Sequence, residues 1–164
     1  MSEVKLFTDG SVHPQLKVGF GACLILPDND EIINFDSMVQ TKKFENTSST
    51  KLELQSFLWA ISLIPKEETK ITVYTDSQNI VGLLGRRKRF EENAYVTKKG
   101  TLIANHELYK AFYLIMDQLE CEIVKVKGHK TADEMDAIDE LFTLVDKGSR
   151  QALRDALKLT EKRR

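Results

Sequence analysis

The order of apolar patterns along the chain predicts an α/β protein with a mixed five-stranded sheet flanked by helices. Three strand-like segments near the start are joined by short links, as in an antiparallel meander. Two later strand-like segments are each reached through a helical pattern, which predicts parallel pairing and right-handed crossovers. No repeat or low-complexity linker divides the 164 residues, so we expect residues 1–164 to form one domain.

The first three predicted strands differ in how clearly they are marked. Residues 3–8 alternate apolar and polar side chains and end at Asp9-Gly10, a turn signal. Residues 18–26 are almost continuously apolar, and residues 31–40 form the third predicted strand.

A helix is predicted after these strands. Thr50-x-x-Glu53 has the form of a capping box, and Pro65 marks the helix end. The apolar residues between them recur at helical spacing: Leu54, Phe57, Leu58 and Ile61. Residues 71–75 then predict a fourth strand.

The second half alternates helical and irregular patterns. A short helix is predicted from Ser77, whereas residues 85–100, the basic handle, lack an apolar period and predict an exposed loop. Residues 102–119 predict a helix and residues 121–127 a fifth strand. The chain from about Asp133 is predicted to be helical, including a tail over 147–164 in which Gly148 is a point of interruption.

Composition indicates a soluble globular protein, with 41% hydrophobic and 30% charged residues. No apolar run reaches the roughly 20 residues of a membrane span, and the N-terminus has no secretory pattern. Cys23 and Cys121 lie in apolar segments and predict buried thiols in a reducing, cytoplasmic location. We expect a monomer without membrane partners. Because the net charge is −1, any nucleic-acid partner requires a local basic patch.

Four acids occupy chain positions that can converge. Asp9 and Asp76 end strands whose carboxyl ends meet if the strands are adjacent and parallel. Glu53 lies in the first turn of the helix between them, and Asp139 lies on the last helix. Four clustered carboxylates require cations, and oxygen-only ligand sets suit Mg²⁺ or Mn²⁺. Such a cluster can hold two metals for in-line displacement at phosphorus.

Each acid also has an ordinary structural interpretation. Asp9 alone is typical of a turn, and Glu53 alone of a capping box. Asp76 alone is typical of a helix start, since Thr75-x-x-Gln78 has the form of a second capping box. Asp139 alone is typical of a solvated helical face. Spacing by itself leaves both interpretations open.

The sequence motifs of these segments resemble those of type 1 ribonuclease H. The matching stretches occur in the family's order over about residues 3–146: "FTDGS…GFGACLI", "TKLELQSFLWAI", "VYTDSQNIV" and "VKGHKTADEMDAIDELF". The resemblance implies a ribonuclease H-like sheet of order 3-2-1-4-5, with strands 1–3 antiparallel and strands 4–5 parallel. It also implies hydrolysis of the RNA strand of RNA/DNA hybrids with two Mg²⁺ ions, Mn²⁺ being a substitute.

The resemblance assigns roles to individual residues. It implies that Asp9 bridges both metals, that Glu53 and Asp76 hold one, and that Asp139 holds the other. It implies that His129 acts in proton transfer or product release, although a histidine there is also typical of an ordinary exposed loop.

The resemblance also implies contacts with the hybrid. Gln78 is expected to contact nucleotides, and the main-chain amide of Gly10, with Ser11, to approach the RNA strand. Ser48, Ser49 and Thr50 stand where the family places small polar residues against phosphate and sugar; alternatively they only begin a helix.

Two segments depart from the family. The glycine-rich turn after the first motif is replaced by "VHPQLKV", and the handle lacks tryptophan, since Trp59 falls in the first predicted helix. The handle has a local charge of about +4 from six cations and two acids: Arg86, Arg87, Lys88, Arg89, Lys98 and Lys99 against Glu91 and Glu92. We expect its cations to contact DNA phosphates, with Tyr95 or Phe90 as a stacking surface.

The sequence therefore predicts a hybrid-specific endonuclease leaving 5′-phosphate and 3′-hydroxyl ends. Two alternatives stay open. One is a resolvase- or transposase-type DNA nuclease with the same acids, and the other is a non-catalytic nucleic-acid binding module.

Overall fold

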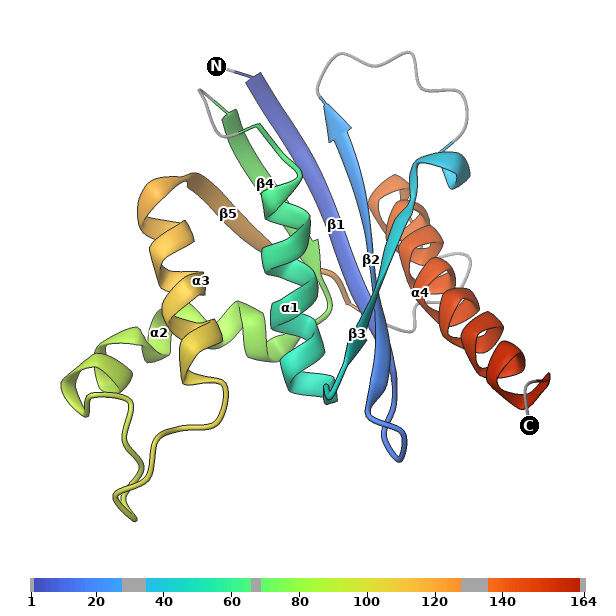
Figure 1. Cartoon of the computed structure of the whole chain (residues 1–164). Helices are drawn as coiled ribbons and strands as arrows, with labels where there is room; N and C mark the ends of the chain where they lie inside the picture. Colours follow the sequence, from blue (N-terminus) through green and yellow to red (C-terminus); the bar gives the residue numbers. More distant parts are fainter. Residues whose placement is uncertain (1, 28–34, 66–68, 128–135, 163–164) are drawn as a thin grey trace.

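The computed structural model describes residues 2–27, 35–65, 69–127 and 136–162, and its centre is a five-stranded sheet of order β3-β2-β1-β4-β5 (Figure 1). β1 pairs antiparallel with β2 and parallel with β4, β2 pairs antiparallel with β3, and β4 pairs parallel with β5. The predicted sheet order and strand directions are confirmed. The strands are β1 (Ser2–His13), β2 (Val18–Pro27), β3 (Gln40–Glu45), β4 (Thr69–Thr75) and β5 (Glu120–Lys125).

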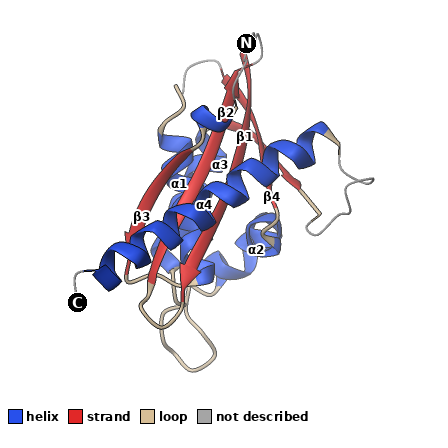
Figure 2. Cartoon of the chain, turned by 90° about the vertical axis from the view of Figure 1, so that its right-hand side faces the viewer, coloured by secondary structure: helices blue, strands red, loops and turns tan. Residues whose placement is uncertain are grey.

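Helices cover both faces of the sheet. One face carries α1 (Ser49–Ser62), α2 (Gln78–Glu92) and α3 (His106–Gln118), and the 3-10 turn η1 (Asp36–Met38) precedes β3. The opposite face carries the long helix α4 (Ala137–Lys162), which crosses the strands obliquely (Figure 2). No helix in the described part of the chain is long and apolar enough to span a membrane.

Alternation along β1 divides the interior into two cores. Leu6 is fully buried in the core shared with α1, α2 and α3. Phe7 points to the other face, where it stacks on Tyr74 at 4.9 Å between ring centroids and packs in the core that includes Val145 of α4. Because successive side chains of a strand alternate between faces, Asp9 and Ser11 lie on the α4 side with Phe7.

A pair of glycines lets α1 lie close to the sheet. Gly10 of β1 is paired with Gly21 of β2. A Cβ at Gly10 would come within 3.0 Å of Leu52, and one at Gly21 would collide with Ser56. Because these glycines have no side chains, α1 lies close to the sheet, and Glu53, which lies between Leu52 and Ser56, is held over the central strands.

Two of the first three strands differ from prediction. β1 continues through Asp9 and Gly10 to His13 instead of turning, because both residues are paired with β2. The third strand is Gln40–Glu45, not 31–40. Its side chains are almost all exposed, so backbone pairing with β2 forms this edge strand without an apolar pattern. Residues 28–34 lie outside the described structure.

The helix starts also differ from the predicted capping boxes. α1 is capped by Ser48, whose Oγ accepts from the amide of Lys51 at 3.3 Å, and not by Thr50. α2 is capped by Ser77, whose Oγ accepts from the amide of Ile80 at 3.2 Å, and not by Thr75. In both cases a serine two residues from the predicted position provides the N-cap oxygen.

The handle prediction is wrong for its first half, because α2 continues to Glu92. Its apolar contacts are Leu83 and Phe90, seven residues apart on one face, which a search for a full apolar stripe misses. The next helix begins at His106 rather than 102. α4 runs through Gly148 without a break. The glycine lets the helix lie close to Val39, since a Cβ there would come within 2.9 Å of that side chain.

Candidate active site

Three of the four predicted acids converge. Asp9 of β1, Glu53 of α1 and Asp76 after β4 line one small pocket, together with Thr8, Gly10, Ser56, Thr75, Ser77 and Ile80. We call this the acidic pocket. It lies at the carboxyl end of β4 and beside the middle of β1, where the parallel part of the sheet meets the N-terminal half of α1.

Ser77 connects the end of β4 to α1. Its amide donates to Oγ1 of Thr75 at 3.1 Å, and its Oγ donates to Oε2 of Glu53 at 2.6 Å. The same Oγ accepts a hydrogen bond from the Ile80 amide and so caps α2. Ser77 therefore fixes the Glu53 carboxylate and the turn that contains Asp76. The sequence had predicted a capping box of Thr75 and Gln78 at this helix start.

The acid that contacts Asp9 from the last helix is Asp146. Their side chains are hydrogen-bonded, and the Gly10 amide also bonds to the Asp9 carboxyl group. Burial raises the pKa of Asp9 well above its usual range, and the hydrogen bond to Asp146 and the charge of Asp76 raise it further. A bond between two carboxyl groups needs one proton, and the raised pKa of Asp9 makes Asp9 the partner that donates to Asp146.

Asp139, the acid predicted from the sequence, occupies another position. Its amide donates to Oδ1 of Asp136 at 2.9 Å, and its Oδ2 accepts the Asp136 amide at 3.1 Å. This is a reciprocal capping arrangement at the start of α4. Asp146 lies seven residues further on the same helical face, about 10 Å along the axis. The structure therefore places Asp146 against Asp9, and the metal role predicted for Asp139, which is buried, stays a prediction.

The sequence contained a signal for Asp146 that the motif reading missed. Asp146 follows Val145, which is fully buried and belongs to the apolar stripe of this helix. The spacing of seven also puts Asp146 on the face of Asp139. Motif matching assigned the role to the acid ten residues after His129, whereas packing of α4 on β1 brings in the acid two turns later.

Asp146 is supported by its own helix. Arg150 Nε lies 3.1 Å from its Oδ1, and the Ser149 Oγ donates to its carbonyl at 3.0 Å. Ser149 is fully buried, and its Oγ is 2.8 Å from the Oγ of Ser11 on β1. The predicted substrate residue Ser11 thus has a packing partner on α4.

The donor set suits a hard divalent cation, although the described residues contain no group of three or more His, Cys, Asp or Glu side chains arranged as a metal cluster. Glu53 is turned to Ser77, and Asp9 and Asp146 share a proton. Burial also raises the pKa of Glu53, the bond from Ser77 lowers it, and the charge of Asp76 raises it. Clustered carboxylates repel one another, and a divalent cation such as Mg²⁺ or Mn²⁺ offsets this repulsion when it binds their oxygens.

The remaining substrate candidates lie around this pocket. Ser48, Ser49 and Thr50 are exposed at the start of α1. Gln78 is exposed at the start of α2, and its Oε1 accepts from Nζ of Lys125 at 2.6 Å. Lys125 is paired in the sheet with Thr75, the residue before Asp76. His129 lies outside the described residues.

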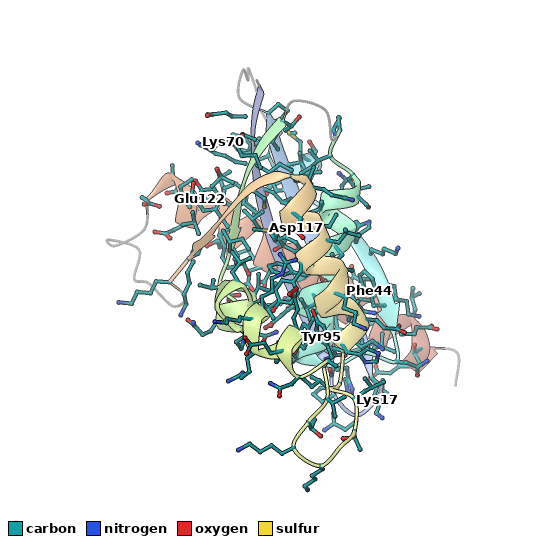
Figure 3. All side chains as sticks on the ribbon, turned by 90° about the vertical axis from the view of Figure 1, so that its left-hand side faces the viewer. Lys17, Phe44, Lys70, Tyr95, Asp117 and Glu122 are labelled. Atoms are coloured by element: carbon teal, nitrogen blue, oxygen red, sulfur yellow. The ribbon has the colours of Figure 1, made fainter. Side chains whose placement is uncertain are left out.

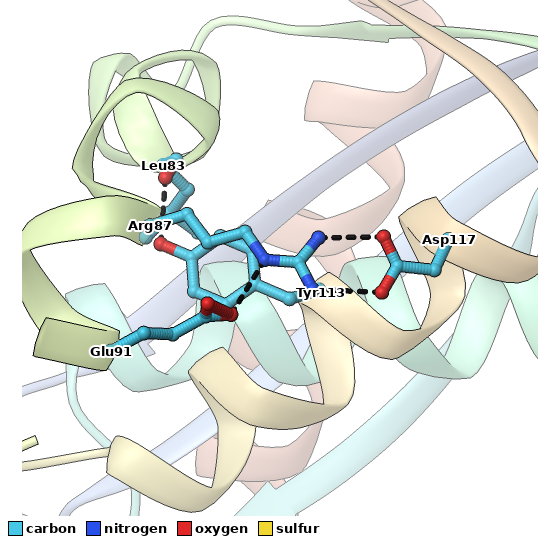
Figure 4. Close-up of polar contacts among 5 residues, drawn as sticks. All are labelled: Leu83, Arg87, Glu91, Tyr113 and Asp117. Carbon is cyan, nitrogen blue, oxygen red and sulfur yellow. Dashed lines mark hydrogen bonds and ion pairs between the residues drawn. The ribbon is translucent and has the colours of Figure 1, made fainter. Parts of the chain in front are cut away.

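Two of the six handle cations, Arg86 and Arg87, form close hydrogen bonds or ion pairs within the protein. Arg87 forms a two-pronged ion pair with Asp117 of α3 at 2.6 and 2.7 Å, bonds Glu91 at 2.7 Å, and lies over the Tyr113 ring (Figure 4). Arg86 donates to the Asn79 carbonyl and side chain at 2.7 and 2.6 Å. Lys88 and Arg89 are exposed, and Lys88 has only a 3.9 Å ion pair with Glu92. Arg87 therefore joins α2 to α3, and a phosphate contact by Arg87 would have to compete with Asp117 and Glu91.

The expected stacking surface is wrong. Phe90 and Tyr95 are each 7% exposed, and Phe90 stacks on Tyr109 at 5.3 Å between centroids. Tyr95 lies at the base of the loop that follows α2 (Figure 3). These rings hold the handle against α3 instead of facing a ligand.

The sheet order, with carboxylates at its two central strands, defines the class of ribonuclease H-like α/β proteins. More particularly, the RNase H family model matches residues 1–145, so the chain belongs to the RNase H family. The match ends one residue before Asp146.

Relatives support this assignment. The chain is 29% identical to the Ribonuclease H of Caldicellulosiruptor saccharolyticus over 86% of this chain and 94% of that protein. It is 27% identical to that of Moorella thermoacetica over 86% of this chain and 90% of that protein. The chain is thus an enzyme of the ribonuclease H class.

Solved structures share the fold. A type 1 RNase H described as carrying the type 2 active-site motif superposes with a TM-score of 0.67 at 17% identity, covering 92% of this chain and 73% of that one. The PFV RNase H domain superposes with a TM-score of 0.63 at 17% identity, covering 92% of each chain.

Proposed function

We propose that this protein hydrolyses the RNA strand of RNA/DNA hybrids at the acidic pocket, leaving 5′-phosphate and 3′-hydroxyl ends. The observation that carries the proposal is the convergence of Asp9, Glu53 and Asp76 with Asp146 hydrogen-bonded to Asp9. Family membership supports the same reaction.

The ligand set we propose is Asp9, Glu53, Asp76 and Asp146, with Asp9 central because it contacts α4 and also lines the pocket. Two Mg²⁺ ions, or Mn²⁺, bound there supply activation of water and neutralisation of charge at phosphorus. Ser77 holds Glu53 in place before binding. A cation held there would require Asp9 to be ionised, with its proton released to solvent, since ligating carboxylates are deprotonated.

Substrate recognition is proposed for the exposed polar residues beside the pocket. Gln78 at the start of α2 and Ser48 to Thr50 at the start of α1 are exposed, and both helices contribute residues to the acidic pocket. A minor groove carrying 2′-hydroxyl groups distinguishes RNA from DNA at such contacts. Because Lys125 occupies the Gln78 Oε1, the amide NH₂ group is available to donate to the groove.

We also propose an intracellular, cytoplasmic protein that acts as a monomer. Cys23 and Cys121 are both free, and burial raises the pKa of each thiol, to about 12 and about 11. Neither is therefore a reactive thiolate at neutral pH.

The test compares wild type with Asp9→Asn and Asp76→Asn on a labelled hybrid in Mg²⁺. We expect each variant to lose more than about 100-fold in kcat, because removal of a charged ligand costs at least as much as loss of a supporting contact. Near-normal cleavage by either variant would contradict the proposal.

The same assay with duplex DNA, duplex RNA and hybrid substrates separates the alternatives. Equal cleavage of duplex DNA and hybrid would favour a resolvase- or transposase-type nuclease. Tight hybrid binding without turnover in Mg²⁺ or Mn²⁺ would favour a binding module.

A further inference from the structure

The C-terminal half of α4 has an unusual charge for this protein. Residues 147–164 contain seven Lys or Arg and two Asp or Glu, a net charge of +5 in a chain whose total is −1. Residues 1–146 therefore carry −6. Neither the acidic pocket nor the handle accounts for this concentration of positive charge.

Three of these cations follow one another at a spacing of four. Arg150, Arg154 and Lys158, here called the basic row, are all exposed, and the spacing continues in the sequence to Lys162. Residues four apart are neighbours on a helix surface, and like charges there destabilise the helix. A helix selected only for stability would alternate acids and bases along such a row.

Helix capping does not explain the row. Cations favour a helix C-terminus only within its last turn, which includes Lys158 at most. Arg150 and Arg154 lie two to three turns earlier. The neighbouring acid Asp155 accepts a hydrogen bond from Gln151 at 2.8 Å.

The row is linked to the acidic pocket through Asp146. Arg150 contacts Asp146 at 3.1 Å, and Asp146 contacts Asp9. From there α4 crosses toward the β3 edge of the sheet (Figure 2). Arg154 also borders a groove of about 440 Å³ against η1, where Lys147 is a second cation and Asp36 the one acid among the described lining residues.

We propose that the basic row is a second phosphate-binding surface for the nucleic-acid substrate, running from the acidic pocket along α4 on the side away from the handle. This inference rests on the proposed function. From Arg150 to Lys158 the helix rises about 12 Å, a length over which one strand presents about three or four phosphates. A cation held by Asp146 would compete with Arg150 for that carboxylate, and Arg150 would then be able to contact the substrate backbone.

The test uses the double variant Arg154→Gln/Lys158→Gln, which leaves the Asp146 contact intact. We expect kcat on a long hybrid to be unchanged and KM to rise about three- to tenfold. The slope of log affinity against log salt should fall by about 2, since each lost phosphate contact contributes about 0.9. A short hybrid that covers only the acidic pocket should show no change.

The matched control is Lys5→Gln/Lys70→Gln, which removes the same charge elsewhere. Lys70 lies at the end of the sheet opposite Lys17 and Tyr95 (Figure 3), and Lys5 is near the start of β1. An equal rise of KM in the control would mean that only net charge matters and would overturn the proposal. So would an unchanged salt slope in the row variant.

Binding by fluorescence anisotropy in an Asp9→Asn background separates this inference from the proposed function. If wild type cleaves hybrids but the row variant binds long and short hybrids normally, the phosphate-binding role of the basic row is wrong and the proposed hybrid cleavage is supported. If wild type cleaves no hybrid, the proposed function fails. Weaker binding of long nucleic acid by the row variant would still support the row.

Discussion

The acidic pocket and the basic handle are both concentrations of one charge in the sequence, but they differ in how far neighbouring groups of the protein compensate that charge. In the handle Arg87 is paired with Asp117 and Glu91, and Arg86 with Asn79. In the pocket Asp9 lies near Asp76 and bonds to Asp146 of α4, and among these three acids Arg150 pairs with Asp146 alone. Charges compensated by neighbours stabilise the fold, whereas a buried excess of one sign indicates a place for a ligand of the other sign.

The largest effect should separate two aspartates of α4. Asp146→Asn should lower hybrid-cleavage kcat more than about 100-fold, because a cation ligand is lost. Asp139→Asn should keep activity within about threefold and lose about 0.5–2 kcal/mol of stability, the usual cost of a helix cap. The measurements are steady-state kinetics in Mg²⁺ and thermal unfolding. A reversed order of activities would restore the motif-based assignment of Asp139.

The next effect concerns stability without metal. The raised pKa of Asp9 means that the folded state holds a proton more tightly than the unfolded state, so the associated stability is present at low pH and is lost as pH rises through the folded pKa. In EDTA, wild type should melt lower at pH 8.5 than at pH 5.5.

Asp9→Asn should remove part of that pH dependence and raise the Tm at pH 8.5 by several degrees, at about 2–4 °C per kcal/mol. Adding Mg²⁺ should raise the Tm of wild type but not of the variant. A variant that melts lower than wild type at both pH values would show that Asp9 is not under electrostatic strain.

The smallest effect should come from the handle. Arg87→Met should lower the Tm by a few degrees, because α2 loses its connection to α3 (Figure 4), while KM for hybrid stays within about twofold. Lys88→Gln/Arg89→Gln should leave the Tm unchanged and reduce the salt slope of binding by up to about 2. If Arg87→Met instead raises KM as much as the double variant, the distinction between paired and exposed cations fails.

Local sequence patterns predicted the sheet better than the helix boundaries. The central strands β2 and β4 are apolar and were placed within two residues. β3 has no apolar alternation, because it is an exposed edge whose formation depends on pairing with β2. α2 buries few of its side chains, so its extent past residue 85 is decided by Phe90 packing on Tyr109 and not by a stripe.

The site was predicted where one residue sits at a strand or helix end. Asp76 follows β4 and Glu53 lies near the start of α1, whereas Asp9 lies just beyond the last β1–β4 pair although β1 itself continues to His13. Asp146 was missed because its position depends on how far α4 slides along β1, a tertiary distance set by Val145, Ser149 and their partners. Both capping motifs were misplaced by two residues, because several serines and threonines compete for each N-cap.

A crystal structure of the protein soaked with Mn²⁺ tests the central claim most directly. Anomalous scattering locates the cation without assumptions about which acid is a ligand. We predict Mn²⁺ within about 2.0–2.2 Å of carboxylate oxygens of Asp9 and Asp146, in the pocket also lined by Glu53 and Asp76. Mn²⁺ bound at Asp139, with the Asp9–Asp146 hydrogen bond intact, would contradict the account.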